Sequence, residues 1–247
     1  MSQNGVGLTE SIVHARTGNY PYRAGMGMIN SAEFVVMMDD FVSPVGSNLP
    51  LGWDAVVIDV GATVVTDTTA GSLGASGVLL FDSDGATEGA CFYGEKCIQL
   101  TAGKKFFMEM RFNTEIADDS DVQFGLSALT AVVNPEDIWT TAAADLVAFG
   151  VLDGSATVKM LSDKSNSGST AETGTKSLSN DTWHVLGIYF DGYTLRGYVD
   201  GALALTWAQA STTIPTGVAL APFVGFRNGS AATTEGHVDY VRYVLQR

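Results

Sequence analysis

Carboxylates are the first side chains to consider for chemistry in this 247-residue chain, which contains 27 Asp and Glu. Glycoside hydrolysis needs two carboxylates at a defined separation across a cleft, one of them with a raised pKa. Glu109 and Asp239 could approach each other on one face of a sheet, but nothing in the sequence enforces such a pair. We favour outward salt bridges or sheet-edge positions for both, and we predict no catalytic residue.

Candidate metal ligands are similarly sparse. The three histidines, His14, His184 and His237, are far apart and lack zinc-binding spacing. Residues 82–85 (Asp-Ser-Asp-Gly) and 118–121 (Asp-Asp-Ser-Asp) offer clustered oxygen atoms, yet neither has the full spacing of a calcium loop. We interpret both as solvated turns and predict no metal ion and no cofactor.

Nucleophilic chemistry has no supporting pattern either. The sequence has no Gly-x-Ser-x-Gly elbow in a strand-turn-helix context and no phosphate-binding Gly-x-x-x-x-Gly-Lys. Cys91 and Cys97 flank a segment that we interpret as a tight hairpin centred on Gly94, which would place the two thiols opposite each other. A disulfide there would close only a short loop, so we favour two reduced cysteines.

Tryptophan faces can stack on sugar rings, and four are available. Trp183 begins an alternating segment and is expected in the core. Trp139, in a proline-containing loop at 134–139 that could start a short helix, is the most exposed candidate. Trp139 is therefore the predicted sugar contact, ahead of Trp53 and Trp207.

The elements that must position these residues are strands. Short β-rich runs separated by turn sequences recur along the chain, which is typical of an all-β sandwich. The expected strands are residues 33–41, 54–60, 77–81, 90–93, 96–101, 104–116, 122–130, 145–152, 157–162, 173–177, 183–190, 194–199, 202–207, 218–227 and 236–245.

Alternation and turn residues support this prediction. In residues 105–112, Phe106, Met108, Met110 and Phe112 share one face, which we expect in a core, while Phe107, Glu109 and Arg111 share a face expected to meet water. Hairpin turns are predicted at four dipeptides: Asp153-Gly154, Asp191-Gly192, Asp200-Gly201 and Asn228-Gly229.

The first 32 residues show neither the two-residue alternation of strands nor the 3.6-residue repeat of helices. We therefore divide the chain into an extended N-terminal arm at 1–32 and one sandwich domain at 33–247. The arm contains aromatic and methionine side chains that suit a surface rather than free solution. Its candidate interface anchors are Tyr20, Tyr22, Met26 and Met28.

Charge and hydropathy exclude several classes of protein. A net charge of −14 with 13 Lys and Arg disfavours nucleic-acid binding. No run approaches the 18 apolar residues of a membrane-spanning helix, so no membrane partner is expected. The start has neither the basic nor the apolar region of a signal peptide, so synthesis in a host cytoplasm without a signal peptide is expected.

Residues 183–192 (Trp-His, an alternating strand, Asp-Gly) and 195–201 (a second alternating strand, Asp-Gly) resemble the paired strands of concanavalin A-like and laminin-G-like jelly rolls. Residues 238–244 resemble the closing strand of such domains, returning beside the first. The resemblance implies an antiparallel two-sheet jelly roll and no particular activity. Glycanases of this fold have a Glu-x-Asp-x-x-Glu or Glu-x-Asp-x-Glu strand, which this sequence lacks.

The acidic composition, the many small residues and the N-terminal arm also resemble those of decoration (cement) proteins of tailed-phage virions. The first functional expectation is therefore a structural virion protein on the capsid surface. It would bind the major capsid protein or other virion subunits through its arm and form a homo-oligomer, with a trimer favoured. The alternative is a carbohydrate-binding lectin-like module, free or in a tail fibre, with a glycan as its partner.

Overall fold

The computed structural model describes residues 34–39, 53–58, 63–66, 78–82, 85–128, 145–165, 170–229 and 234–247. They form two eight-stranded sheets, A and B, whose strand pairs are antiparallel. The predicted all-β, two-sheet jelly-roll sandwich is confirmed. Within these residues, helix is limited to the 3₁₀ turn η1 (Ser211–Thr213), and no helix is long and apolar enough to cross a membrane.

Sheet A contains both the first and the last described strands. β1 pairs with β16, as expected for a closing strand that returns beside the first. The strands of sheet A, in spatial order, are β14 (Ala202–Thr206), β13 (Leu195–Val199), β12 (His184–Phe190), β7 (Phe106–Thr114), β16 (Gly236–Gln246), β4 (Leu79–Asp82) and β3 (Thr63–Thr66), with β1 (Phe34–Asp39) also on β16.

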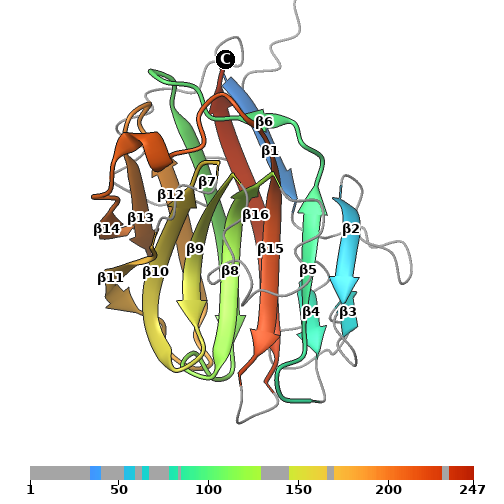
Figure 1. The fold of residues 1–247 in the computed structure, drawn as a ribbon. Helices are drawn as coiled ribbons and strands as arrows, with labels where there is room; N and C mark the ends of the chain where they lie inside the picture. The colour runs from blue at the N-terminus through green and yellow to red at the C-terminus, as the bar shows by residue number, and fades with distance from the viewer. Residues whose placement is uncertain are drawn as a thin grey trace, which may run out of the picture.

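Sheet B lies in front of sheet A in Figure 1, where β8, β9, β10 and β15 are seen before β7, β12 and β16. Its strands, in spatial order, are β11 (Glu172–Ser177), β10 (Ser155–Asp163), β9 (Leu146–Leu152), β8 (Ser120–Ser127), β15 (Ala219–Asn228), β5 (Gly89–Gly94) and β2 (Trp53–Ile58), with β6 (Ile98–Gln99) also on β15. The sequence predicted all of these strands except β3.

The core lies between the two sheets. The predicted inward face of β7 is confirmed, because its two phenylalanines and two methionines are buried in the core cluster. Glycine allows close approach of the layers: a Cβ on Gly197 of sheet A would lie 2.6 Å from the ring of Phe149 in sheet B. Each fully buried phenylalanine contributes on the order of 2 kcal/mol, so this interface dominates the stability.

Three of the four predicted hairpin turns are confirmed. Asp153-Gly154 joins β9 to β10, Asp191-Gly192 opens the loop from β12 to β13, and Asp200-Gly201 joins β13 to β14. Asp200 and Gly201 have φ values of 50° and 78°, as a tight two-residue hairpin turn requires. The fourth prediction was wrong, because Asn228-Gly229 connects β15 of sheet B to β16 of sheet A and therefore crosses between layers.

The predicted hairpin around Gly94 was also wrong. β5 and β6 do not pair with each other; both follow β15, through Tyr93 opposite Phe223 and Ile98 opposite Leu220. The chain therefore continues along one ladder, and residues 95–97 lie outside it. Cys91 is buried, which raises the pKa of its thiol to about 12, whereas Cys97 is exposed, and both are free.

The second face of β7 meets water only in part: Arg111 is partly exposed, but the rest of the predicted set is not. Phe107 and Glu109 are buried, and the Glu109 carboxylate lies 2.7 Å from Nη2 of Arg242 on β16 and accepts a 3.0 Å hydrogen bond from the Tyr240 hydroxyl. The Arg242 guanidinium also lies over the Phe107 ring, 5.7 Å from its centroid. Alternation correctly predicted which residues share this face. It did not predict that Glu109 is buried, which its ion pair with Arg242 on the neighbouring strand makes possible.

The close packing of β8 and β9 leads to a first prediction. A Cβ on Gly150 would overlap the backbone carbonyl of Val122, which cannot move without breaking the ladder, whereas a Cβ on Gly187 would meet its neighbours at 3.6 Å, an ordinary contact. Gly150→Ala should lower the free energy of unfolding by about 1–3 kcal/mol, and the matched Gly187→Ala by less than about 0.5 kcal/mol. Urea unfolding curves measure both, and equal effects would contradict this packing.

The buried ion pair leads to a second prediction. Glu109→Gln leaves the Arg242 charge, on a side chain only 4% exposed, without its counterion. This variant should lose about 3–5 kcal/mol of stability. The combined variant Glu109→Leu, Arg242→Met, Tyr240→Phe removes these three polar groups together and should recover most of that loss. Denaturant unfolding of both proteins is the measurement, and a Glu109→Gln loss below about 1 kcal/mol would contradict the prediction.

Candidate functional site

The described tryptophans differ in how far they are buried, and the difference is not the one that the sequence predicted. Trp207 is 4% exposed and donates its indole N–H to Thr213 Oγ1 at 3.0 Å, and Trp53 packs edge-on against Phe92 at 4.6 Å. Trp183, expected in the core, is instead half-buried and lies outside the core cluster. The predicted sugar contact, Trp139, and the predicted arm anchors at 20, 22, 26 and 28 lie outside the described residues.

Trp183 belongs to a compact group of charged and aromatic side chains on the outer face of sheet A. The Arg111 guanidinium lies over its indole ring, 4.5 Å from the centroid, and Arg111 Nη1 lies 2.6 Å from Asp239 Oδ2. The His237 ring meets the indole edge-on at 6.5 Å, and His237 Nε2 lies 3.6 Å from Glu235 Oε2. We call these five residues the Trp183 cluster.

A β-bulge places Asp239 beside Arg111. In the backbone register, Val238 is opposite Phe112 and Tyr240 is opposite Arg111. Asp239 is therefore an extra residue on β16, with no residue of β7 opposite it in the ladder. The side chain of a bulged residue points in a different direction from the one that the regular strand would give it. The Arg111 and Asp239 side chains are 38% and 23% exposed, which leaves both accessible to a ligand.

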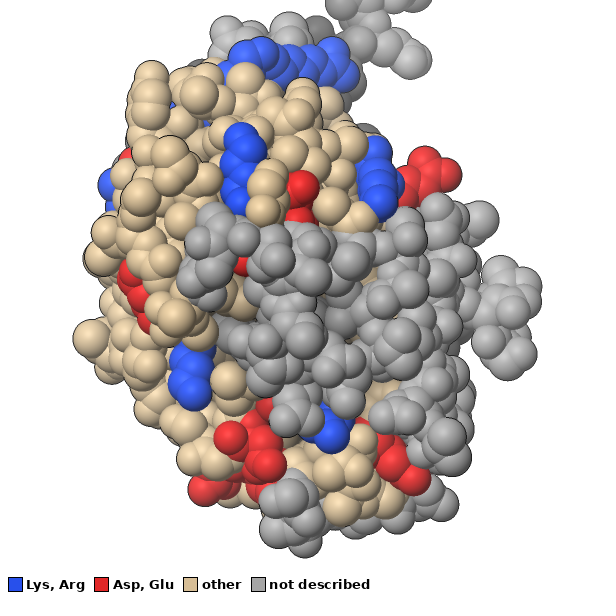
Figure 2. Space-filling model, in the orientation of Figure 1, with Lys and Arg blue, Asp and Glu red and all other residues tan. Residues whose placement is uncertain are grey.

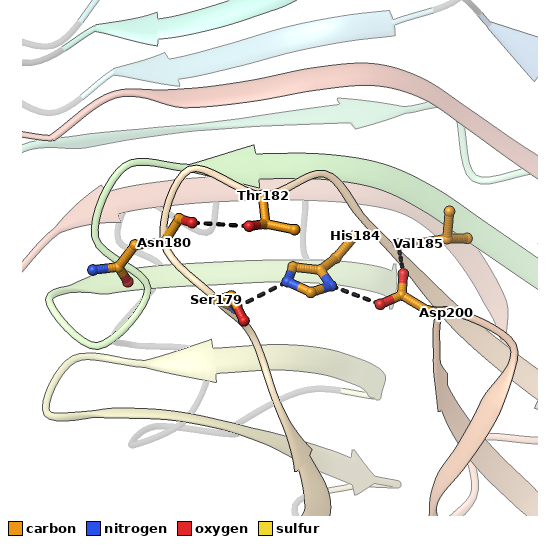
Figure 3. A network of polar contacts seen from close by, with 6 residues as sticks. All are labelled: Ser179, Asn180, Thr182, His184, Val185 and Asp200. Carbon is orange, nitrogen blue, oxygen red and sulfur yellow. Dashed lines mark hydrogen bonds and ion pairs between the residues drawn. The ribbon is translucent and has the colours of Figure 1, made fainter.

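The loop before β12 is held by backbone and side-chain hydrogen bonds. Asn180 Oδ1 accepts from the backbone N–H of Ala117 at 3.0 Å, and the backbone N–H of Asp181 donates to Thr114 O at 2.9 Å. Thr182 Oγ1 donates to Asn180 O at 2.9 Å, as Figure 3 shows. We call residues 179–183 the Trp183 loop, because these bonds fix the approach of Trp183 to the sheet.

His184 closes the loop from the other side. Its ring lies between Ser179 and Asp200 in Figure 3, with Nε2 accepting from the Ser179 backbone N–H at 2.9 Å and Nδ1 lying 2.7 Å from Asp200 Oδ2. Because Nε2 accepts, the proton of the neutral ring is on Nδ1 and is donated to Asp200. Burial acts to raise the pKa of Asp200, but hydrogen bonds from His184 and the Val185 backbone hold it below its ordinary value.

This arrangement does not suit His184 for base catalysis. A histidine base needs one ring nitrogen free to take a proton from a nucleophile, as in a Ser-His-Asp triad. Both nitrogens of His184 are engaged, and Ser179 approaches through its backbone N–H rather than its hydroxyl. The described geometry therefore gives His184 a structural role in the loop.

The two carboxylates considered from the sequence each pair with an arginine. Glu109 is buried against Arg242, not outward as expected, whereas Asp239 forms the outward salt bridge with Arg111 that the sequence analysis favoured. A glycosidase instead places two carboxyl groups on either side of the scissile bond, with one of them protonated. In this structure both carboxylates are instead ion-paired with arginines, and Glu109 is fully buried.

Within the described part of the chain, no group of three or more His, Cys, Asp or Glu side chains could hold a metal ion. In the 118–121 turn, Asp121 is not solvated as expected: it is buried, accepts from the Asp153 backbone N–H at 2.8 Å, and lies 3.4 Å from Arg227 Nη1. Burial raises the pKa of Asp121, and these two contacts act in the opposite direction. Residues 83 and 84 of the other turn lie outside the described residues.

The end of the sandwich that holds the Trp183 cluster is acidic. Figure 2 shows acidic side chains gathered at the lower end of the visible face, where β15 ends and β8 begins. On the loops next to the cluster, Glu115 and Asp181 are exposed, and Glu115 Oε2 accepts from the Glu235 backbone N–H at 3.4 Å. Exposed carboxylates thus lie on the loops next to a site whose own guanidinium is already paired with Asp239.

Comparisons by sequence give no match, either to protein-family models or to curated proteins. Comparison by structure gives several, at identities that show the fold alone. Lectin II from Ulex europaeus has a TM-score of 0.58 at 13% identity, with 85% of this chain and 97% of the lectin covered.

Two further structures extend the comparison. The Emp47p carbohydrate recognition domain has a TM-score of 0.56 at 11% identity, covering 87% of this chain and 98% of that domain. The apo Crh5 transglycosylase has a TM-score of 0.52 at 15% identity, covering 86% and 84%. The fold is therefore the lectin-like, concanavalin A-like jelly roll that the sequence resemblance implied.

Proposed function

We propose that this chain is a carbohydrate-binding, lectin-like module that contacts a neutral glycan through the Trp183 cluster. The observation that carries the proposal is a partly exposed tryptophan on a lectin-like sandwich, held beside a partly exposed arginine–aspartate pair. The order of the two functions expected from the sequence is thereby reversed. Capsid decoration stays a prediction, because its arm lies outside the described residues.

The chemistry of the cluster supports sugar recognition. A sugar ring presents an apolar C–H face that packs on an aromatic ring, and hydroxyl groups at its edge that need hydrogen-bond partners. Trp183 offers the aromatic surface, while Asp239 can accept and Arg111 can donate charge-assisted hydrogen bonds. Because the Arg111–Asp239 bond and the Trp183 loop fix these groups beforehand, little entropy is lost when a ligand binds.

The surrounding charge favours neutral sugars. Exposed Glu115 and Asp181 lie on the loops next to the cluster, the cluster itself contains Glu235, and the chain carries a net charge of −14. A sulfated or sialylated glycan would meet repulsion there that a neutral one does not. We place binding ahead of catalysis because Glu109 and Asp239 are both paired with arginines.

A glycan array tests this proposal. The wild-type protein should bind neutral glycans, with sulfated and sialylated ones weakest. Trp183→Ala should weaken binding about 30-fold, the effect of removing a central aromatic contact worth about 2 kcal/mol. Titration calorimetry with the strongest array ligand measures the factor, and thermal unfolding checks that the variant folds.

Tyr193→Ala is the matched control. Tyr193 is 70% exposed on the loop between β12 and β13, at the opposite end of β12 from Trp183, so its removal should leave binding unchanged. Trp139→Ala tests the site expected from the sequence. Loss of binding in Trp139→Ala but not in Trp183→Ala would place the site elsewhere, and silence of the wild-type protein across the array would reject the function.

A further inference from the structure

We propose that His184 and Asp200 are positioning residues for Trp183, acting through a hydrogen bond to the Ser179 backbone that exists only while the His184 imidazole is neutral. Protonation of His184 loosens the Trp183 loop and weakens ligand contact by Trp183. The ligand part rests on the proposed function. The loop part does not, because it concerns contacts within the chain.

The hydrogen-bond geometry supplies the first step. Neutral His184 accepts from the Ser179 N–H through Nε2, at 2.9 Å, and donates from Nδ1 to Asp200 Oδ2, at 2.7 Å. An imidazolium has two N–H donors and no acceptor. A proton on Nε2 would point at the Ser179 N–H, so that bond must break while the bond to Asp200 persists.

The second step links the bond to Trp183. Ser179 begins the Trp183 loop and His184 follows it, so the lost bond is the one that joins the two ends of the loop. The bonds of Asn180 to Ala117 and of Asp181 to Thr114 do not involve His184 and remain. Protonation should therefore loosen the loop without detaching it from the turn after β7.

The charged group next to the His184 ring determines which protonation state of the ring its surroundings stabilise. Asp200, on the turn between β13 and β14, is the charged side chain in contact with the His184 ring among the described residues. It stays ionised in mildly acidic solution, because hydrogen bonds keep its pKa below the ordinary value despite partial burial, so it favours the imidazolium.

A second histidine lies near Trp183 and must be distinguished from the first. His237 contacts the indole ring edge-on, and its Nε2 lies 3.6 Å from Glu235 Oε2. Arg111 and Asp239 are the other charged members of the cluster. Since both side chains are imidazoles, the experiment needs a variant of each histidine.

Hydrogen exchange measured by mass spectrometry on residues 178–183 tests the loop step. After correction for intrinsic exchange, protection in the wild type should fall about 2- to 10-fold between pH 7.5 and pH 5.5, the factor expected for one neutral hydrogen bond. His184→Gln does not titrate and should lose this pH dependence. Unchanged wild-type protection, or the same dependence in His184→Gln, would overturn the proposal.

Asp200→Asn tests the positioning role through the pH midpoint of loop release, which would not change if Asp200 had only a structural role. The asparagine keeps an acceptor for the Val185 N–H but removes the charge that favours the imidazolium. The midpoint of loop release should therefore move to lower pH. A uniform loss of protection at every pH, with the midpoint unmoved, would contradict the positioning role, and so would a pH dependence that disappears in His237→Gln.

The glycan array, repeated at pH 7.5 and 5.5, separates this inference from the proposed function. Wild-type signal should fall at pH 5.5, while His184→Gln should keep its pH 7.5 signal. Loop release without glycan binding at either pH would support the positioning role and reject the function. Binding that is equal at both pH values, with unchanged loop protection, would support the function and reject the positioning role.

Discussion

Burial of two apolar sheet faces against each other is the constraint on which the rest of the structure depends. The inner residues of both sheets are almost completely buried, and phenylalanines are the largest of them. The layers can approach this closely only where one side supplies no side chain, as at Gly197 over Phe149 and Gly236 over Phe226. With the strands fixed in this way, variation is confined to strand ends, connecting loops and outer faces.

The end of the sandwich that carries the Trp183 cluster is joined by a buried polar chain as well as by apolar contacts. Thr114 Oγ1 lies 3.1 Å from Ser120 Oγ, which lies 3.1 Å from Thr234 Oγ1, which donates to Asn228 Oδ1 at 2.8 Å. These residues belong to ends of β7, β8 and β15 and to the approach to β16, so the chain crosses between the sheets. Because each buried hydroxyl has a partner, this end can be rigid without a larger core.

The sequence was sufficient to predict the layers because alternation and Asp-Gly turns are local signals. The inward set of β7 and the hairpins at Asp153, Asp191 and Asp200 follow from residues within a few positions of one another. The errors involve partners far away in the chain. Burial of Glu109 depends on Arg242, and the path of β5 and β6 depends on β15, neither of which leaves a local trace.

The candidate site was missed only partly for the same reason. Alternation put Arg111 on the outer face of β7, but the bulge that brings Asp239 beside it comes from the pairing of β16 and has no signature in the sequence. Trp183 was expected in the core because it begins the predicted alternating strand at 183–190. Counting back by twos from Leu186 places His184 on the inward side and Trp183 on the outward side, so this signal was available and was not used.

That alternation has a physical consequence for the site. Adjacent residues of an extended chain point in opposite directions, so the side chain that anchors the Trp183 loop from within and the aromatic ring that faces outward are separated by one peptide bond. A change in the hydrogen bonding of the inner ring therefore acts on the backbone that aims the outer one, with no intervening side chains. This separation by a single peptide bond is the feature by which, in our proposal, a sandwich with a rigid core adjusts a contact at its rim.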